Sequence, residues 1–487
     1  MRLSQLQEPE LEFGAGSAGR HIDIRFGLMN YGPATHSVDS APKTIKVGFV
    51  GTQKSIATVK QWMVDMSKGV AQKESRYPNL RPAFLGFNKE TNYEAEWVTE
   101  DRFEHAVTAG ELADVLDIPV GDAAVIRAVD LFAEKIKALS ESAKVDVIVC
   151  APPIELFRHL EPVAPREPVA SLDADSTDEG KNHLKLDFHD MLKARTLVFA
   201  QPIQFIRPIT YDASVKETTK LGRTRALQDP ATRAWNFFTA LYYKAGGTPW
   251  RLCREATDLD TCYIGVSFYR SLDRQQVRSS VAQVFNERGE GMILRGADAD
   301  YCEEDKQHHL TEENMKALLM DALKHYGVEH RNQPARVVLH KTSGYNEAEL
   351  AGCRAALKEY RVHSCDLTVI RKSAIRLFRN GQFPPLRGTF VALDDRYSLL
   401  YTRGTIDFYK MYPGQYVPRA LEIEATHTDS PSVKIAEEIL ALTKMNWNNT
   451  QFDSLDPITV RAARQVGDIL KYVDPKTPIT TKYSYFM

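Results

Sequence analysis

Short apolar runs alternate with amphipathic helical segments along the first half of the chain, and this alternation restricts the fold more than any other feature. TIKVGFVG (44–51) and VDVIVCAPP (145–153) end in glycine or proline, which predicts buried strands. Residues 119–139 place apolar side chains at helical spacing, and another helix is expected after Ser55, a good N-cap. Because strands separated by helices need crossover connections, the pattern predicts an α/β fold with a parallel, doubly wound sheet.

After about residue 255 strand patterns become more frequent, which predicts a second α/β domain with a mixed sheet. Strands are expected at 261–270, 280–296, 335–342, 365–372 and in a hairpin within 388–405. Helices are expected near 311–327, 346–359, 432–443 and 457–470. The boundary between the two domains is expected near residues 250–256. The expected domains are therefore 1–253, with a loose lead-in, and 254–487.

The charge balance excludes a protein that is basic over its whole surface. Lys and Arg total 62 against 64 Asp and Glu, for a net charge of −2, so any nucleic-acid site must be local. No apolar run reaches the roughly 18 residues of a membrane span, and the first residues lack the apolar core of a secretory signal. The 6 cysteines form no CxxC pair, which is typical of reduced thiols. We therefore expect a cytoplasmic protein with no membrane partner.

The first candidate site is GFVGTQKS (48–55). A P-loop has the form G-x-x-x-x-G-K-[ST] between a strand and a helix, and Gly48, Lys54 and Ser55 stand at matching places. Gln53 replaces the second glycine, although that position favours glycine because the backbone must approach the phosphate closely. The strand at 145–153 also lacks a terminal Asp for magnesium. One hypothesis is a stand-alone nucleotide-binding enzyme, and the other is an ordinary strand–helix turn.

The second candidate site combines several residue types that bind phosphate. His189 and Lys193 are four residues apart on an expected helix (188–200), so they share one face. Gln204 follows on the next expected strand (202–207), and Lys244 lies near the end of a later helix (232–247). Ammonium, imidazole and amide groups from different elements supply the charge-assisted hydrogen bonds that a terminal phosphate needs. The alternative for each residue by itself is a solvated surface position.

The segments that carry these four residues, FHDMLKA, PIQFIR and LYYKAGGTPWRL, resemble the MID domain of Argonaute proteins. In that family a His/Tyr-x-x-x-Lys pair, a Gln and a Lys before a GG-x-PW turn bind the 5′ phosphate of a guide. CYIGVSFYR is similar to the first strand of a PIWI domain, and ILALTKMNWNN (439–449) to its late helix and Asn-rich turn. The resemblance implies a Rossmann-like MID domain followed by an RNase H-like PIWI domain. It leaves no segment for N-terminal and PAZ domains, as in short prokaryotic Argonautes.

The resemblance also implies a role for the C-terminal tail. In the family the last residues fold back, and the terminal carboxylate helps to hold a magnesium ion at the guide phosphate. TKYSYFM ends in apolar residues, and the expected ligands of Mg²⁺ are the carboxylate of Met487 and the side chain of Gln204. The alternative is that SYFM is only a hydrophobic anchor.

The resemblance further implies a PIWI domain that binds but does not cut. An RNase H-like site needs carboxylates that place two metal ions about 4 Å apart. Where active relatives carry such ligands, this chain has Ser267, Thr342 and Arg464. Serine and threonine do not replace anionic ligands, and arginine would repel the metals. Asp394 and Asp395 are expected to mark a hairpin turn. An active nuclease with relocated carboxylates is the alternative.

Binding without cutting requires a basic channel that holds the guide–target duplex by its backbone. Lys341 and Arg464 are the more interesting cations because they lie beside the lost catalytic positions. The full set of candidate backbone-binding residues is Arg207, Lys341, Arg371, Lys372, Arg403 and Arg464. A separate cluster in an acidic loop, Cys302 with His308 and His309, has little of the ligand set that a metal site needs.

Short Argonautes of this kind work with a partner that carries an APAZ region and usually an effector. The resemblance implies a heterodimer that loads a small guide RNA and recognises complementary single-stranded DNA of an invader. Target pairing would then activate the effector. A sirtuin-like NADase is expected ahead of a TIR NADase or a nuclease, so that NAD depletion halts the infected cell in an abortive infection.

Overall fold

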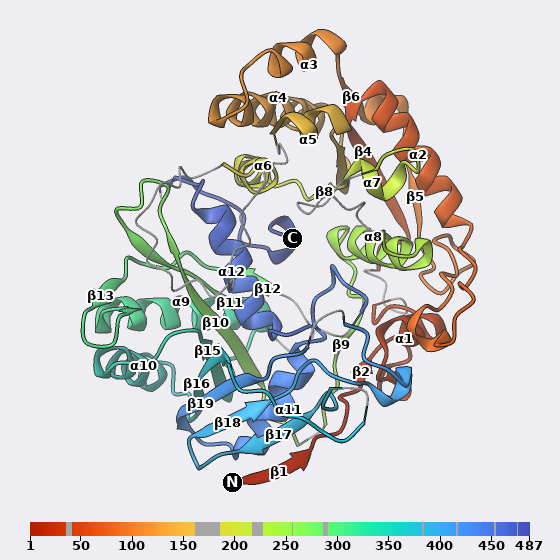
Figure 1. The fold of residues 1–487 in the computed structure, drawn as a ribbon. Helices are drawn as coiled ribbons and strands as arrows, with labels where there is room; N and C mark the ends of the chain where they lie inside the picture. Colours follow the sequence, from red (N-terminus) through yellow and green to blue (C-terminus); the bar gives the residue numbers. More distant parts are fainter. Residues whose placement is uncertain are drawn as a thin grey trace.

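The computed structural model describes residues 1–35, 41–160, 186–216, 227–255, 257–285, 291–381, 384–414, 417–451, 454–474 and 476–487. Figure 1 shows two lobes, with the C terminus where they meet. The acidic, proline-rich stretch at 161–187, expected to be a loop, lies almost entirely outside the described residues, and so does half of the polar stretch at 211–230, also expected to be a loop. Within the described part of the chain, no helix has the length and apolar character needed to cross a membrane.

The first lobe is built on a parallel sheet with strand order β5-β4-β7-β8, and β6 also pairs with β4. Every residue of β7 is buried, as expected for a central strand covered on both faces. This confirms the predicted parallel α/β sheet. The strands are β4 (Thr44–Thr52), β5 (Glu96–Val98), β6 (Glu104–Val107), β7 (Val147–Ala151) and β8 (Ile203–Phe205).

The helices of the first lobe follow the predicted alternation, with shifted ends. Contrary to the expectation, Ser55 does not cap α2: this helix begins at Gln53, and the hydroxyl of Thr52 accepts from the Ser55 N–H at 3.2 Å. The helices are α1 (Ile24–Tyr31), α2 (Gln53–Ser67), α3 (Ala109–Leu116), α4 (Asp122–Ser142), α5 (Ile154–Leu160), α6 (Phe188–Thr196), α7 (Pro208–Tyr211) and α8 (Pro230–Lys244).

The second lobe contains a nine-stranded mixed sheet with strand order β1-β17-β18-β19-β16-β15-β10-β11-β12. The run expected as one strand at 280–296 is a hairpin of β11 and β12, while the hairpin expected within 388–405 is confirmed as β17 and β18. In this lobe β13 and β14 pair with each other in a separate sheet. Its strands from β10 on are β10 (Thr261–Arg270), β11 (Val277–Phe285), β12 (Gly291–Ile293), β13 (Asp300–Cys302), β14 (Gln307–His309), β15 (Arg336–Lys341), β16 (Ser364–Lys372), β17 (Thr389–Ala392), β18 (Tyr397–Leu400) and β19 (Leu421–Thr428).

Helices flank this sheet, with α9 (Glu312–His330) and α10 (Glu347–Glu359) on its left in Figure 1 and α11 (Ser432–Leu442) and α12 (Ile458–Leu470) on its right. One of these helices, α12, packs closely against β10. A Cβ on Gly265 would stand 2.1 Å from the backbone oxygen of Thr459, so only glycine allows this contact. The helix that carries Arg464 is thereby fixed against the strand that carries Ser267.

The N-terminal residues are not the expected loose lead-in. β1 (Arg2–Gln5) pairs with β17 in the second lobe, so the first strand does not belong with the rest of residues 1–253. β2 (Leu11–Glu12) pairs with β3 (Arg20–His21) and β9 (Arg251–Leu252). The partners β17 and β9 are far away in the sequence, and strands as short as these carry no local pattern that indicates their pairing.

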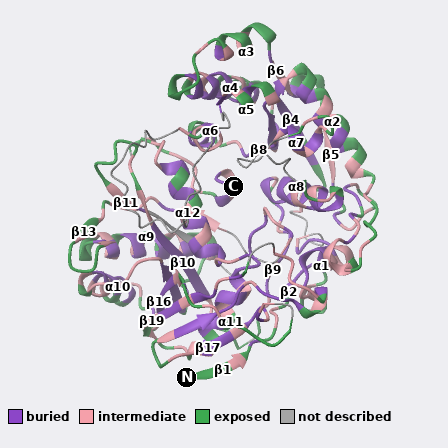
Figure 2. Cartoon of the chain, in the orientation of Figure 1, coloured by how far each residue is buried: buried purple, intermediate pink, exposed green. Residues whose placement is uncertain are grey.

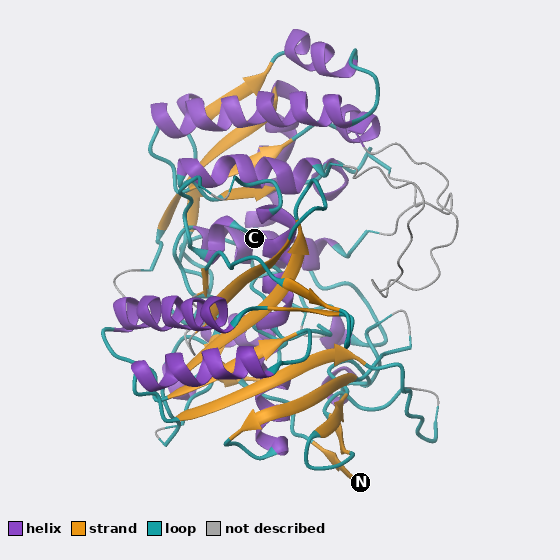
Figure 3. Cartoon of the chain, turned by 90° about the vertical axis from the view of Figure 1, so that its left-hand side faces the viewer, coloured by secondary structure: helices purple, strands orange, loops and turns teal. Residues whose placement is uncertain are grey.

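One hydrophobic core runs through both lobes, from Leu11 to Met487. Buried strands cross both lobes in Figure 2, and Figure 3 shows the lobes from the side with the C terminus at their junction. At this junction the indole of Trp250 donates to the carbonyl of Lys444 at 3.0 Å, and Trp447 donates to the carbonyl of Trp250 at 3.1 Å. The two lobes therefore share one interior.

Candidate functional site

Four elements meet at the lobe junction: α6, β8, the C-terminal end of α8, and the tail with its 3₁₀ turn at Tyr483–Tyr485. Asp187 caps α6 by accepting from the Asp190 N–H at 2.9 Å, which fixes where the helix begins. The tail is held by the second lobe, where the Ile293 N–H donates to Thr481 O at 2.7 Å. Tyr483, Phe486 and Met487 are buried.

Lys193 points from α6 into this junction and is 4% exposed. Its ammonium donates to the backbone oxygen of Phe486 at 3.0 Å, so the tail is tied directly to the helix. Burial lowers the pKa of Lys193 from its ordinary 10.5 to about 7. Burial therefore destabilises the charged form of Lys193, and a bound anion would offset this cost.

Lys244, at the end of α8, enters the same junction and is 5% exposed. Its ammonium donates to Ile203 O at 2.9 Å and to Gln204 Oε1 at 2.8 Å. Burial, and then the charge of Lys193, lower the pKa of Lys244 well below its ordinary value. Among the described residues neither lysine forms an ion pair with a carboxylate. Lys193, Lys244 and Gln204 thus form a buried cluster, called the cup below, whose two ammonium groups favour an anion.

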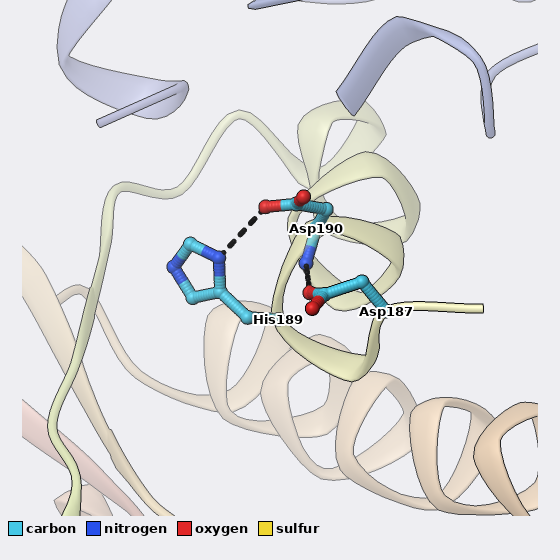
Figure 4. A group of neighbouring side chains, drawn as sticks. All are labelled: Asp187, His189 and Asp190. Atoms are coloured by element: carbon cyan, nitrogen blue, oxygen red, sulfur yellow. Dashed lines mark hydrogen bonds and ion pairs between the residues drawn. The ribbon is translucent and has the colours of Figure 1, made fainter. Parts of the chain in front are cut away.

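His189 stands one helical turn before Lys193, at the edge of this cup. Its Nδ1 lies 2.9 Å from Asp190 Oδ1, as Figure 4 shows, and its ring lies 5.0 Å from that of Phe205. The side chain is 41% exposed. Burial lowers the pKa of His189, and Lys193 adds to this, while the hydrogen bond with Asp190 opposes it. The structure therefore brings His189, Lys193, Gln204 and Lys244 to one place, although their roles as phosphate ligands stay a prediction.

Sequence reasoning missed the carboxylates beside His189. Ligand atoms of Asp187, His189 and Asp190 all lie within 4.8 Å of one another, and no other such group of three occurs among the described residues. Asp190 follows His189 directly in the sequence, and this adjacency was the available signal. Since Asp190 engages Nδ1, it orients the imidazole and leaves Nε2 to face a ligand.

The positions expected to replace catalytic carboxylates lie on three elements of the second lobe that pack together. Ser267 is buried on β10, Thr342 directly follows β15, and Arg464 is on α12. Arg464 forms an ion pair with Asp456 at 2.5 Å. That these positions make the domain inactive stays a prediction.

Lys341, proposed as a phosphate-binding cation, is the clearest correction. Its side chain is fully buried, and its ammonium lies 2.5 Å from Glu349 Oε1 and 2.8 Å from Gly344 O. Glu349 also accepts from the Leu310 N–H and contacts His309 Nδ1 at 3.1 Å. Lys341 therefore neutralises a buried carboxylate and is closed to a nucleic-acid backbone. Its position at a strand end could not reveal Glu349, which is brought to it by α10.

The other proposed channel cations are scattered over several elements. Arg207 stacks on the ring of Phe157, with 4.4 Å from guanidinium carbon to ring centroid. Arg371 pairs with Glu424 at 2.9 Å, Lys372 is exposed, and Arg403 is half-buried in the loop after β18. Of the six residues, only Lys341 is excluded by its burial.

The remaining candidates do not form sites of the expected kinds. Gly48 lies inside β4 and α2 starts at Gln53, so GFVGTQKS has no loop that could cradle a phosphate; the Ser55 hydroxyl donates to Ala151 O at 2.7 Å. Asp394 sits in the β17–β18 turn, where it accepts from two backbone N–H groups. His309 is held by Asp305 and Glu349, and Cys302 lies on the paired strand β13.

The described structure has the fold of Argonaute proteins. No protein-family model matches the sequence, and no curated protein matches it either. Clostridium butyricum Argonaute bound to a guide DNA (5′ deoxycytidine) and a 19-mer target DNA matches with a TM-score of 0.62 at 15% identity, over 97% of this chain and 53% of that one. A. aeolicus Argonaute matches with a TM-score of 0.56 at 14% identity (98% and 54%), and Drosophila Piwi with 0.59 at 14% (99% and 56%). The chain thus spans about half the length of the structures it matches.

Proposed function

We propose that this chain is the guide-binding subunit of a prokaryotic immune complex, which binds the 5′ phosphate of a small RNA guide and recognises complementary single-stranded DNA. The observation that carries the proposal is the buried cup of Lys193, Lys244 and Gln204, whose two ammonium groups form no ion pair with a carboxylate among the described residues, in a chain with the Argonaute fold. The solved Clostridium butyricum structure, which contains a guide and a target DNA, supports a nucleic acid as the ligand.

The chemistry of the cup suits a phosphate monoester. A dianionic phosphate would neutralise both ammonium groups, which among the described residues donate only to carbonyl and amide oxygens. His189 adds a donor from Nε2 once its ring is protonated, with Asp190 stabilising the imidazolium. The tail closes the cup because Lys193 holds Phe486 O. A phosphate of the guide backbone carries one negative charge, so the cup prefers the 5′ end.

Magnesium is an accessory part of the proposal. Gln204 Oε1 is an oxygen ligand of the kind that Mg²⁺ accepts, but it already accepts from Lys244 at 2.8 Å. Metal and ammonium would therefore compete for this oxygen, and the residues present do not form a ready metal site. We assign the neutralisation of the phosphate to the lysines. The role of the Met487 carboxylate as a magnesium ligand stays a prediction.

We expect the chain not to cleave its target. Ser267 and Thr342 offer no anionic ligand, and Arg464 brings a positive charge. The one group of three metal-binding side chains among the described residues, Asp187 with His189 and Asp190, lies in the other lobe. An APAZ-containing partner would then carry the signalling activity. We favour a sirtuin-like NADase, which depletes NAD, as the effector of this partner, ahead of a TIR NADase or a nuclease.

The test of the cup is the difference in affinity between 5′-phosphorylated and 5′-hydroxyl RNA of one sequence. In the double variant His189→Ala/Lys193→Met this difference should fall by at least about 100-fold, since each of the two charge-assisted hydrogen bonds that are lost contributes about 1.5–3 kcal/mol. Lys324→Met, an exposed lysine on α9, is the matched control. An unchanged preference for the 5′ phosphate in the double variant would refute the proposed pocket.

A second test concerns cleavage. The variant Ser267→Asp/Thr342→Asp should remain unable to cut a paired target with Mg²⁺ or Mn²⁺, because the other ligands are missing. The unmodified chain, loaded with guide and target, is its control. Cleavage by the variant would show that the catalytic positions are misassigned, and cleavage by the unmodified chain would establish the nuclease alternative.

The partner is tested by purifying the chain from its native host. We expect a stoichiometric APAZ-containing protein together with small 5′-phosphorylated RNA, and NAD loss in the complex only when complementary DNA is added. A chain that purifies alone, with target-independent function, would contradict this part of the proposal and leave the phosphate cup untouched.

A further inference from the structure

A cleft of about 470 Å³ lies in the second lobe between α10 and the ends of β16 and β19. The proposed function does not use it: α10 is on the outer side of the sheet, away from the C terminus and the phosphate cup (Figure 1). Its floor is apolar, formed by Leu350, Leu357, Val362 and Leu367. The volume falls within the roughly 300–1,000 Å³ of small-molecule sites, which are also mostly apolar with a few polar groups.

The rim of this cleft is basic. Arg354 and Lys358 are four residues apart on α10, and Arg361 follows the helix in a left-handed conformation with φ 55°. Within the described residues, Lys358 and Arg361 form no ion pair, and Arg354 has only a 3.9 Å contact with the exposed Glu347. The helix-end carbonyl of Leu357 is capped by the Val362 N–H at 2.9 Å. The cations, rather than the helix carbonyls, therefore define the charge at the rim.

A β-bulge supplies a polar atom in the wall of the cleft. Leu367 pairs with His427 and Thr368 with Ala425, which leaves Thr426 as the extra residue of β19. Bulges re-aim side chains and occur often beside functional sites. The Thr426 hydroxyl is buried and has no hydrogen-bond partner within the described part of the chain, a cost that a bound ligand would remove. Asp429, which accepts from the Cys365 N–H at 2.8 Å, adds a carboxylate to the same wall.

We propose that this cleft binds a nucleoside phosphate. Three permanent cations, with His363 and His427 beside them, call for an anion of more than one charge, which favours a phosphate chain over a carboxylic acid. The apolar floor accepts the flat face of a base. The Thr426 hydroxyl and the Asp429 carboxylate provide the hydrogen-bonding groups that a sugar or base edge requires. An inorganic anion would leave the floor and Thr426 without a role.

Calorimetric titration of the full-length chain with ATP tests this site. A 5′-phosphorylated guide is bound first, so that the phosphate cup is filled, and His189→Ala/Lys193→Met is titrated in parallel to show that the cleft is separate. We expect ATP to bind in both cases, at least tenfold more tightly than tripolyphosphate, which lacks a base, or adenosine, which lacks phosphate. A 5′-hydroxyl RNA strand should compete weakly, since the cleft holds one nucleotide.

The decisive variant is Lys358→Glu/Arg361→Glu, because both side chains are exposed and their change should leave the fold intact. This variant should weaken ATP binding at least tenfold. Lys324→Glu/Lys434→Glu, which makes the same charge change at exposed positions outside the cleft, should leave ATP binding unchanged. Thr426→Val should weaken ATP binding severalfold. Because it removes a buried unsatisfied hydroxyl, it should leave the unfolding midpoint unchanged or raise it. Equal ATP affinity in the decisive variant and its control, or equal binding of ATP and tripolyphosphate, would overturn the proposal.

Discussion

At the scale of single residues, the chemistry of the cup depends on ammonium groups whose pKa is lowered by burial. The pKa of Lys193 is lowered by burial to about 7, so above this pH the empty cup loses a charge. An anion that binds the charged form raises that pKa, and binding above pH 7 therefore takes up a proton. Asp190 acts in the same direction on His189 through its contact with Nδ1.

We therefore predict that the preference for a 5′ phosphate falls as pH rises above 7, by up to about tenfold per pH unit while Lys193 is the group that gains the proton. Asp190→Asn should move the fall to lower pH, because His189 then loses the group that stabilises its proton. Affinities of phosphorylated and hydroxyl guides between pH 6 and 9 measure this. A flat profile in the unmodified chain would contradict it.

The same pKa shift has the opposite consequence for the empty protein. Since the folded pKa of Lys193 lies below its ordinary 10.5, the unfolded chain binds more protons between about pH 7 and 10.5. The free energy of unfolding contributed by this group therefore rises with pH across that window and is lowest below pH 7. Phosphate binding and stability without ligand thus respond to pH with opposite signs.

At the scale of elements, the tail is both a packing element and a wall of the cup. Phe486 is 2% exposed, and its backbone oxygen holds the ammonium of Lys193. Phe486→Ala should lower the free energy of unfolding by about 3–5 kcal/mol and reduce the preference for a 5′ phosphate, because the displaced tail no longer positions Lys193. Tyr485→Ala, a half-buried aromatic in the same turn, should cost less in both measurements. Equal effects of the two variants would show that the tail is only an anchor.

At the scale of the whole molecule, one continuous core and a buried charge cluster join the lobes. Glu8, from the N-terminal segment, pairs with Lys444 at 2.6 Å and with Arg387 at 3.0 Å. Although burial alone would raise the pKa of Glu8, these two cations lower it. The segment between β1 and β2 is thereby fixed to the second lobe, and both lobes should unfold together.

We predict a single unfolding transition whose midpoint rises when a 5′-phosphorylated guide is added. At a guide concentration of 100 times Kd the gain is about 2.7 kcal/mol, and a 5′-hydroxyl guide should give distinctly less. Differential scanning calorimetry, with calorimetric and van't Hoff enthalpies compared, measures both points. Two separate transitions would show that the lobes are independent despite their common core.

The agreement between sequence and structure depends on how local each signal is. β10 occupies the predicted residues Thr261–Arg270, because a mainly apolar run of this length that is rich in aromatic and β-branched residues favours a strand. His189 and Lys193 share a helix face, as their spacing requires. The prediction for Lys341 was wrong because its partner Glu349 is brought to it by α10, and β1 was not predicted because its partner strand β17 lies at the other end of the sequence. Neither contact has a trace in the local pattern.

The sequence by itself determined the class of fold, the alternation of the longer strands and helices, and the four residue types suited to a phosphate, since periodicity and side-chain chemistry are local properties. Only the tertiary structure decided that the charge of Lys193 lowers the pKa of Lys244, that the tail carbonyl of Phe486 holds Lys193, and that Asp190 contacts His189 Nδ1. These depend on burial and on distances between remote segments, and both arise only when the lobes pack on a common core.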